Sequence, residues 1–343
     1  MQQAARLLLV ILGSARAARA PAVDDFDWRK FADVQVEQAE QVEQMADDVS
    51  LNFLSATLGD QMVLQRAPKQ AIVFGHTLPH ANVTTTFNGN SYTATADAGG
   101  TWRQALPAME ASTTPFNLTF TGSAGEKASL RDVVFGDVFV CGGQSNMQFA
   151  MGAVANATEE IAKADEYPHV RLFTVGQGTK SAIALGDLQT VEQRWAVASA
   201  KSISGNGGFG YFSAVCWFFG RHVSEGLGNK VPIGLVSNNW GGTPVEMWST
   251  SETFKACNRS AANGSLFNAM IAPYTVGPMA LRGFTWYQGE ANTHDLASAQ
   301  AYGCMITEMI NTWRKVFAAP DAYFGFVQLC APRSSIRCLT ART

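Results

Sequence analysis

One serine of this sequence stands where acyl chemistry would need a nucleophile. In the stretch VFVCGGQSNMQF, residues 138–149, Ser145 follows two glycines at the end of an apolar run. Such a junction predicts the end of a strand and the beginning of a helix. The hydroxyl then has two interpretations. It caps the helix, as serine often does, or it is a nucleophile beside the unpaired backbone N–H groups of the first helical turn.

Two further loops carry side chains of the same kind. The loop NWGGTPVE, residues 239–246, follows the apolar run 233–238, and QGEAN, residues 288–292, follows the run 281–287. Each loop taken alone is explained better by a tight turn, a helix cap or a core tryptophan. Glycine lets the backbone approach a ligand closely, and backbone or amide N–H groups stabilise the oxyanion of a tetrahedral intermediate. Three such loops together favour the nucleophile interpretation.

These segments resemble the three signature blocks of the sialate O-acetylesterase family, within the SGNH hydrolase superfamily. The blocks read GGQSNMQF, WGGTPVEMWS and WYQGEAN, and MVLQRAPKQAIVFGHT and DAGGTW extend the similarity, which runs from about Leu51 to Leu329. The resemblance implies a serine esterase that removes acetyl groups from sugars, typically from the 9-position of sialic acid. It also implies that neither a metal nor an organic cofactor takes part.

The resemblance suggests a role for each block. Ser145 matches the nucleophile and would contribute its own N–H to the oxyanion hole. Gly241 or Gly242 matches the second donor, and Gln288 or Asn292 would supply an amide as the third. We favour Gln288 because it stands directly at the strand end. Four neighbours are expected to contact the substrate or organise the loops: Gln144, Trp240, Glu246 and Glu290.

The base that a serine nucleophile requires is the missing part. It is usually a histidine oriented by a carboxylate, and the family takes both from a D-x-x-H motif, which these 343 residues do not contain. His294, beside Asp295, follows a signature block, but an exposed histidine at a helix start explains it better. We therefore expect an incomplete α/β domain over 133–330, a non-family tail over 331–343, and turnover near background.

Two other functions compete with the esterase. A protein that binds carbohydrate without catalysis would keep an aromatic lining of Trp240, Trp248, Trp286 and Tyr287. The segment GNGGFG, residues 205–210, spells the G-x-G-x-x-G of dinucleotide enzymes. That fingerprint requires a preceding strand and a later acidic residue, whereas AVASAKSIS makes a poor strand and the next strand ends in amides.

The order of elements predicts an α/β fold, a three-layer SGNH-type domain with a mainly parallel sheet. Near-continuous apolar runs suit strands buried on both faces of a parallel sheet, and ligands bind at the carboxyl ends of such strands. The expected strands are 133–141, 170–175, 233–238, 281–287 and 323–329. The expected helices are 302–317 and the segment 211–223, which is apolar all round and so predicted to be buried.

Residues 51–132 have a different rhythm of short β-branched runs between turns. The segment FNGNSYTATA predicts a hairpin about Asn88-Gly89. The whole pattern predicts a small β-sandwich domain that precedes the α/β domain.

The N-terminal segment indicates export. Residues 1–20 have the charge at Arg6, the apolar stretch LLLVILG and the small-x-small ending at Ala20 of a signal peptide, and 21–50 form a polar leader. No other segment approaches the roughly 18 apolar residues of a membrane span. We expect a secreted or lysosomal protein. Five sequons would then be glycosylation sites: Asn82, Asn117, Asn156, Asn258 and Asn263.

Charge and cysteine content bound the partners and the redox state. A net charge of −3 without a Lys/Arg-rich run gives no electrostatic footprint for nucleic acid or an anionic membrane surface. The six cysteines allow several disulfide pairings. Cys216 lies inside the apolar run AVCWFFG and is expected to be a buried free thiol. The oligomeric state is not predicted.

Overall fold

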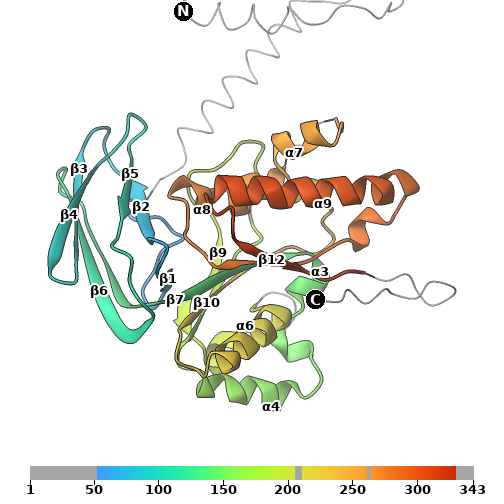
Figure 1. Ribbon diagram of the computed structural model, residues 1–343, viewed down its shortest axis with the longest axis horizontal. Coiled ribbons are helices and arrows are strands. Elements are labelled where there is room, and N and C mark those ends of the chain that lie inside the picture. Colours follow the sequence, from blue (N-terminus) through green and yellow to red (C-terminus); the bar gives the residue numbers. More distant parts are fainter. Residues whose placement is uncertain (1–51, 205–210, 261–263, 330–343) are drawn as a thin grey trace, which may run out of the picture. The chain divides into compact units, whose positions relative to one another are not determined.

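The computed structural model describes residues 52–204, 211–260 and 264–329 (Figure 1). These residues belong to one compact unit. The predicted signal peptide and polar leader, the GNGGFG segment and the tail over 331–343 lie outside the described residues.

A mainly parallel sheet is the centre of the fold, as predicted. Its strands follow the order β9-β8-β10-β7-β11-β12, in which β9 is an antiparallel edge strand and the other neighbours are parallel. All five predicted strands are present, whereas the sequence did not predict β9. The bounds are β7 (Lys127–Gly143), β8 (Val170–Val175), β9 (Val191–Val197), β10 (Ile233–Asn239), β11 (Gly283–Tyr287) and β12 (Tyr323–Phe326).

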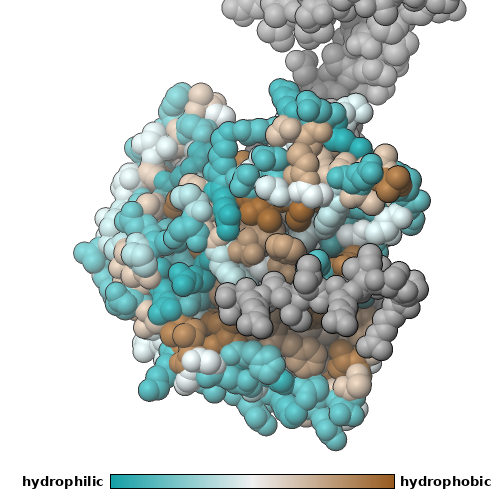
Figure 2. All heavy atoms as spheres, turned by 45° about the vertical axis from the view of Figure 1, so that its right-hand side comes forward, coloured by the Kyte–Doolittle hydropathy of each residue, from teal (hydrophilic) through white to brown (hydrophobic). Residues whose placement is uncertain are grey.

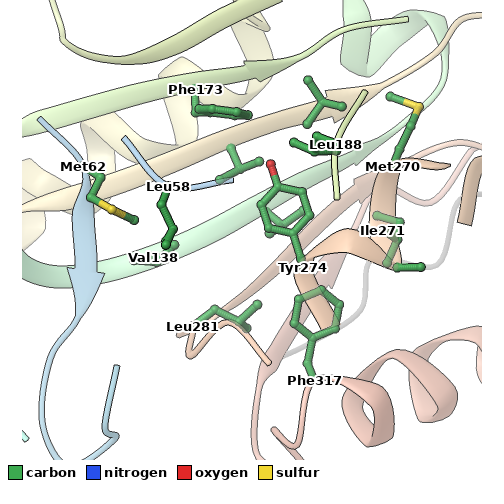
Figure 3. Close-up of a cluster of buried hydrophobic side chains, with 14 of the residues drawn as sticks. Leu58, Met62, Val138, Phe173, Leu188, Met270, Ile271, Tyr274, Leu281 and Phe317 are labelled. Carbon is green, nitrogen blue, oxygen red and sulfur yellow. The ribbon is translucent and has the colours of Figure 1, made fainter. Parts of the chain in front are cut away.

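Helices cover both faces of this sheet and give three layers. Successive residues of a strand point to opposite faces. Accordingly, Val138 of β7 packs in a cluster with the buried side chains of α9 (Leu296–Val316), whereas Phe139 packs in a second cluster with α6 (Ala214–Gly226). Figure 1 shows α9 and α6 on opposite sides of the sheet. Figure 3 shows members of the first cluster, among them Val138 and Phe173 of the sheet.

The two long helices differ in how well they match the sequence. Helix α9 contains the predicted segment 302–317 except its last residue, and begins earlier because the carboxylate of Asp295 caps it by accepting from the Ser298 N–H. Helix α6 buries only one side, since Phe218 and Phe219 are half-buried, so the prediction of full burial was wrong. The shorter helices are α3 (Ser145–Gln148), α4 (Ala157–Ala162), α5 (Ala200–Ser204), α7 (Ser251–Ala256) and α8 (Pro273–Val276).

Strand β7 also carries the β-rich part of the chain. Its first half pairs antiparallel with β6 and extends the sheet through β3 to β4, while β1 pairs parallel with β7 and β2 pairs with β5. The hairpin at Asn88-Gly89 is confirmed, and both turn residues have positive φ. The predicted boundary after residue 132 falls inside β7, and a separate β-sandwich domain stays a prediction. The strands are β1 (Val63–Gln65), β2 (Ile72–His76), β3 (Asn82–Phe87), β4 (Asn90–Thr95), β5 (Thr101–Ala105) and β6 (Ser112–Gly122).

Two disulfides cross-link the α/β part. Cys141 at the end of β7 is bonded to Cys216 of α6, and Cys257 after α7 is bonded to Cys304 of α9. The prediction of a free Cys216 thiol was therefore wrong. The packing of α6 on β7 brings together two cysteines that are 75 residues apart in sequence.

The surface bears on the remaining predictions. The sequon residues within the described ranges are exposed, and Asn263 lies outside these ranges; the exposed ones are Asn82, Asn117, Asn156 and Asn258. Over residues 52–204, 211–260 and 264–329, no helix has the length and apolarity that crossing a membrane requires. The segment that precedes the dinucleotide-like GNGGFG is helix α5, not the strand that such a fingerprint needs.

Candidate active site

The three loops meet because their strands are neighbours. Strand β7 lies between β10 and β11, and Gly143 pairs with Asn239 on one side and with Tyr287 on the other. The three strands therefore end at the same level, at the carboxyl edge of the sheet. We call the segments that follow them the serine loop (residues 143–148), the glycine loop (240–246) and the amide loop (288–292).

Gly143 is required where the serine loop begins. Its φ is +143°, and a β-carbon at this position would lie 2.2 Å from the carbonyl oxygen of Tyr287. Only glycine allows β11 to approach so closely. This contact fixes the path of the chain from β7 into α3.

Ser145 is the first residue of α3 and not its N-cap. Gln144 occupies the N-cap position and makes no capping bond with its side chain, so the capping interpretation of Ser145 was wrong. Ser145 is half-buried. A β-carbon added to Gly241 would lie 3.5 Å from Cβ of Ser145. The serine loop and the glycine loop therefore lie next to each other at Ser145.

The two glycines of the glycine loop differ in their surroundings. The N–H of Gly241 donates to Oε1 of Gln148 at 2.7 Å. Gly242 is exposed, has a φ of +73° and leaves open space where a β-carbon would stand. A β-carbon at Gly241 would thus meet Ser145 and one at Gly242 would not, but the N–H of Gly241 already has an acceptor. Which glycine donates to an oxyanion stays open.

Gln288 joins the three loops. Its Nε2 lies 3.1 Å from Oε1 of Gln144, 3.1 Å from the carbonyl oxygen of Thr243 and 2.8 Å from Oδ1 of Asn292. Gln144, Gln288 and Asn292 are all buried. The presentation of Gln288 to a substrate oxyanion stays a prediction, since its amide protons are here donated within the protein.

The rest of the network is built from the same amides. Oε1 of Gln144 also accepts from the N–H groups of Gly289 and Ala291, at 3.3 and 3.1 Å. Asn292 accepts from the N–H of Val245 at 2.9 Å, a bond that joins the amide loop to the glycine loop a second time. Amide side chains therefore fix the loops relative to one another.

The two predicted carboxylates belong to this network. Oε2 of Glu246 accepts from Nδ2 of Asn292 at 2.8 Å, and its other oxygen lies 3.4 Å from Nη2 of Arg259. Glu290 accepts from Nδ2 of Asn146, which joins the amide loop to the serine loop. Both carboxylates thus organise the loops, and a direct contact with substrate stays a prediction.

The four aromatic residues proposed as a lining are not equivalent. Trp240 is half-buried, and its backbone N–H donates to the carbonyl oxygen of Gly143 at 3.0 Å. Trp248 and Trp286 are fully buried in the core, with their rings edge to face at a centroid distance of 5.8 Å. These two tryptophans are therefore packing residues, and their assignment to a ligand-binding surface was wrong. Tyr287 is half-buried.

The structure gives His294 no catalytic partner in Asp295. Oδ1 and Oδ2 of Asp295 accept from the N–H and hydroxyl of Ser298 at 2.8 and 2.9 Å, and these bonds hold the pKa of Asp295 below its usual value. His294 is exposed, as the helix-start interpretation predicts. Among the described residues, no three His, Cys, Asp or Glu side chains are grouped so as to hold a metal ion.

A cavity of about 460 Å³ lies next to the amide loop, and Ser145 does not line it. The hydroxyl of Tyr302 donates to the carbonyl oxygen of Gln288 at 2.8 Å, and burial raises the pKa of Tyr302 to about 12. The hydroxyl therefore stays protonated and holds the amide loop through this hydrogen bond.

Figure 2 shows a band of hydrophobic residues across a largely hydrophilic face. The exposed apolar side chains include Tyr323, Phe326 and Val327, of which Phe326 and Val327 also line the cavity. The cavity is lined by Gln288, Gly289, Asn292, Thr293, Ala299, Tyr302, Ile306, Phe326, Val327, Gln328 and Leu329.

Comparison with known proteins decides the family. The model of the family "Carbohydrate esterase, sialic acid-specific acetylesterase" matches residues 135–341. The chain belongs to this family. The resemblance seen in the sequence is therefore confirmed, and the match runs past Leu329, where that resemblance was expected to end.

Members of the family and a solved structure agree with this result. The sialate O-acetylesterases of Homo sapiens and Mus musculus are each 34% identical to this chain, over 81% and 79% of it and 57% and 59% of their own lengths. A carbohydrate acetylesterase from Xanthomonas citri has a TM-score of 0.70 at 32% identity, over 81% of this chain and 60% of that one. The chain thus spans less than two thirds of each of these relatives.

Proposed function

We propose that this protein hydrolyses O-acetyl esters of sugars, sialic acids among them, with Ser145 as the nucleophile. Membership of the carbohydrate esterase family supports the reaction class. The observation that carries the proposal is the position of Ser145 next to the glycine loop, where three amide-rich loops meet.

The proposed reaction has two steps. The Ser145 hydroxyl attacks the acetyl carbonyl, loses its proton to a base and forms a tetrahedral intermediate. The N–H groups of Ser145 and of one glycine in the glycine loop stabilise the oxyanion. Collapse of the intermediate releases the sugar hydroxyl, which takes up a proton, and leaves an acetyl group on Ser145. Water then attacks this ester, and acetate leaves.

The amide network supports this proposal because it holds the donors before the substrate arrives. Oxyanion stabilisation is strongest when donors need no reorganisation in the transition state. The Gln288 amide, which contacts oxygens of the serine, glycine and amide loops, supplies that rigidity. If Gly241 is the donor, the oxyanion takes the place of Gln148 Oε1 on its N–H.

We further propose that turnover requires a histidine and a carboxylate in D-x-x-H spacing, which the 343 residues do not contain. The exposed position of His294 and the capping role of Asp295 support this view. The 343-residue chain should then hydrolyse acetyl esters at close to the background rate.

Acetate release from a 9-O-acetylated sialoside tests the proposal. The 343-residue chain and a longer chain that carries D-x-x-H are compared, each with and without Ser145→Ala. The longer chain should be faster, and Ser145→Ala should remove the difference, whereas Ser251→Ala, at an exposed serine of α7, should change nothing. Activity that survives Ser145→Ala would refute the nucleophile. Full activity of the 343-residue chain that survives His294→Ala would refute the account of the base.

Carbohydrate binding without turnover is the second candidate. It is favoured by the half-buried Trp240 and Tyr287 of the candidate site, together with the lack of a D-x-x-H pair in the 343 residues. This candidate would be favoured if the protein binds a sialoside while neither the 343-residue chain nor the longer chain hydrolyses 4-nitrophenyl acetate.

We also propose that the protein enters the secretory pathway and is secreted or lysosomal. Two disulfides support this, because disulfides persist in oxidising compartments, as do the exposed sequons Asn82, Asn117, Asn156 and Asn258. A mass decrease on treatment of the native protein with an N-glycosidase is expected, and the absence of N-glycans would contradict the proposal.

A further inference from the structure

A lysine next to the candidate site has an aromatic partner and, within the described ranges, no acidic one. Nζ of Lys180 lies 4.9 Å from the centroid of the Trp240 ring. Such a contact holds an ammonium group in place by electrostatic attraction to the face of the ring. Lys180 is exposed, and over the described residues it makes no ion pair with a carboxylate. The N–H groups of the Lys180 ammonium that do not face the Trp240 ring can donate to a ligand.

Two connections link the segment that carries Lys180 to the loops around Ser145. Trp240 directly precedes Gly241, where a β-carbon would lie 3.5 Å from Cβ of Ser145. In addition, Nε2 of Gln148 donates to Oε1 of Gln177 at 3.2 Å, and Nε2 of Gln177 donates to the carbonyl oxygen of Asn239 at 2.8 Å. The segment that carries Lys180 is thus fastened both to the serine loop and to the residue that precedes Trp240.

The charges around the loops are asymmetric. Glu246 is bonded to Asn292 and paired with Arg259, and Glu290 is bonded to Asn146. These groups lie on or beside the amide loop, and the positive charge of Arg259 is already compensated by Glu246. Lys180, at Trp240 where the glycine loop begins, has no such compensation from the part of the chain that the structure describes. An anionic group of a substrate is therefore attracted to the Trp240 side of the site.

We propose that Lys180, held by Trp240, binds the carboxylate of an acidic sugar whose acetyl ester lies at Ser145. The inference rests on the proposed function and deepens it, since it names the group that separates a sialic acid ester from a neutral sugar ester. Lys180 is a specificity residue, and it takes no part in the bond changes at the acetyl group.

Binding to the 343-residue chain tests this without any need for turnover. Isothermal titration calorimetry at low salt compares the methyl α-glycoside of N-acetylneuraminic acid with its methyl ester, in which the carboxylate is neutral. The acid should bind about two- to five-fold more tightly than the ester, the range of an exposed ion pair. Lys180→Ala should abolish this preference and Lys180→Arg should retain it. High salt should weaken it.

Lys230→Ala is the matched control, since Lys230 is also exposed but lies just before the amino end of β10; it should leave the preference unchanged. An acid preference that survives Lys180→Ala overturns the inference. A wild-type chain that binds neither ligand, or both equally, overturns it too. If hydrolysis of a neutral acetyl ester depends on Ser145 while the acid has no advantage, only this inference fails. If no hydrolysis depends on Ser145, the proposed function fails, whatever the binding ratio.

Discussion

Gln288→Glu perturbs the amide network with a change of one group, NH₂ to oxygen. The Nε2 atom that is replaced lies 2.8 to 3.1 Å from three acceptor oxygens, those of Gln144, Thr243 and Asn292. An ionised carboxylate cannot donate to any of them. Nε2 carries two hydrogens, which these three acceptors share; two hydrogen bonds at a net 1 kcal/mol each amount to about 2 kcal/mol of unfolding free energy. A buried carboxylate without a partner adds to that loss.

The same argument gives the pH dependence of the variant. The protonated acid can still donate one hydrogen bond, so burial raises the pKa of the new carboxyl above its value in the unfolded chain. The proton therefore stabilises the folded form, and the variant loses stability as the pH rises. The loss of unfolding free energy caused by Gln288→Glu, measured against wild type at the same pH, should be larger at pH 7 than at pH 5.

Urea unfolding followed by tryptophan fluorescence and circular dichroism measures the effect. Gln288→Leu loses the same bonds without a charge and should cost about 2 to 3 kcal/mol, less than Gln288→Glu at pH 7. Gln300→Glu, at an exposed glutamine of α9, should stay within about 0.5 kcal/mol of wild type. If Gln288→Glu also stays within that range at pH 7, Gln288 does not join the loops as described.

Two further predictions concern stability. Replacing Cys141 and Cys216 together by alanine opens a loop of 75 residues, which should cost about 4.5 kcal/mol of unfolding free energy in the chain-entropy model; an unchanged urea midpoint under oxidising conditions would show that the bond is not formed. Burial lowers the pKa of His76, so the folded form binds its proton less readily than the unfolded chain. Stability should fall as the pH drops below about 6.5, and His76→Gln should reduce that fall; an equally steep pH dependence in the variant would contradict the assignment to His76.

The strands of the sheet were predictable because their chemistry is local. A strand buried on both faces must be apolar at nearly every position, as in 133–141 and 233–238. Strand β9, with the sequence VEQRWAV, mixes charged and apolar residues and lies at an edge, so no apolar run marks it. Helix α6 was taken as fully buried because composition alone does not say how much of a helix the sheet can cover.

The meeting of the three loops was predictable, and their bonding was not. Three glycine- and amide-rich loops after three apolar runs indicated where chemistry would occur. That Ser145 follows the N-cap depends on the close approach of β11 to Gly143, which is a tertiary contact. The Cys141–Cys216 bond likewise depends on the packing of α6.

The sequence reasoning missed two residues that lie near the three loops. Gln148 stands three residues after Ser145 in the same helical turn, a spacing that brings side chains together, so the signature block itself held the signal. Lys180 had no signal, because an irregular segment far away in sequence brings it to Trp240.

Peptide mapping after covalent labelling tests the assignment of the nucleophile. The 343-residue chain is incubated with an excess of a fluorophosphonate, for long enough to allow slow reaction without the D-x-x-H pair, and the labelled peptide is identified by mass spectrometry. The phosphonyl group should be found on Ser145 and should disappear in Ser145→Ala. A label on another residue, or undiminished labelling of Ser145→Ala, would contradict the claim that Ser145 is the reactive hydroxyl where the three loops meet.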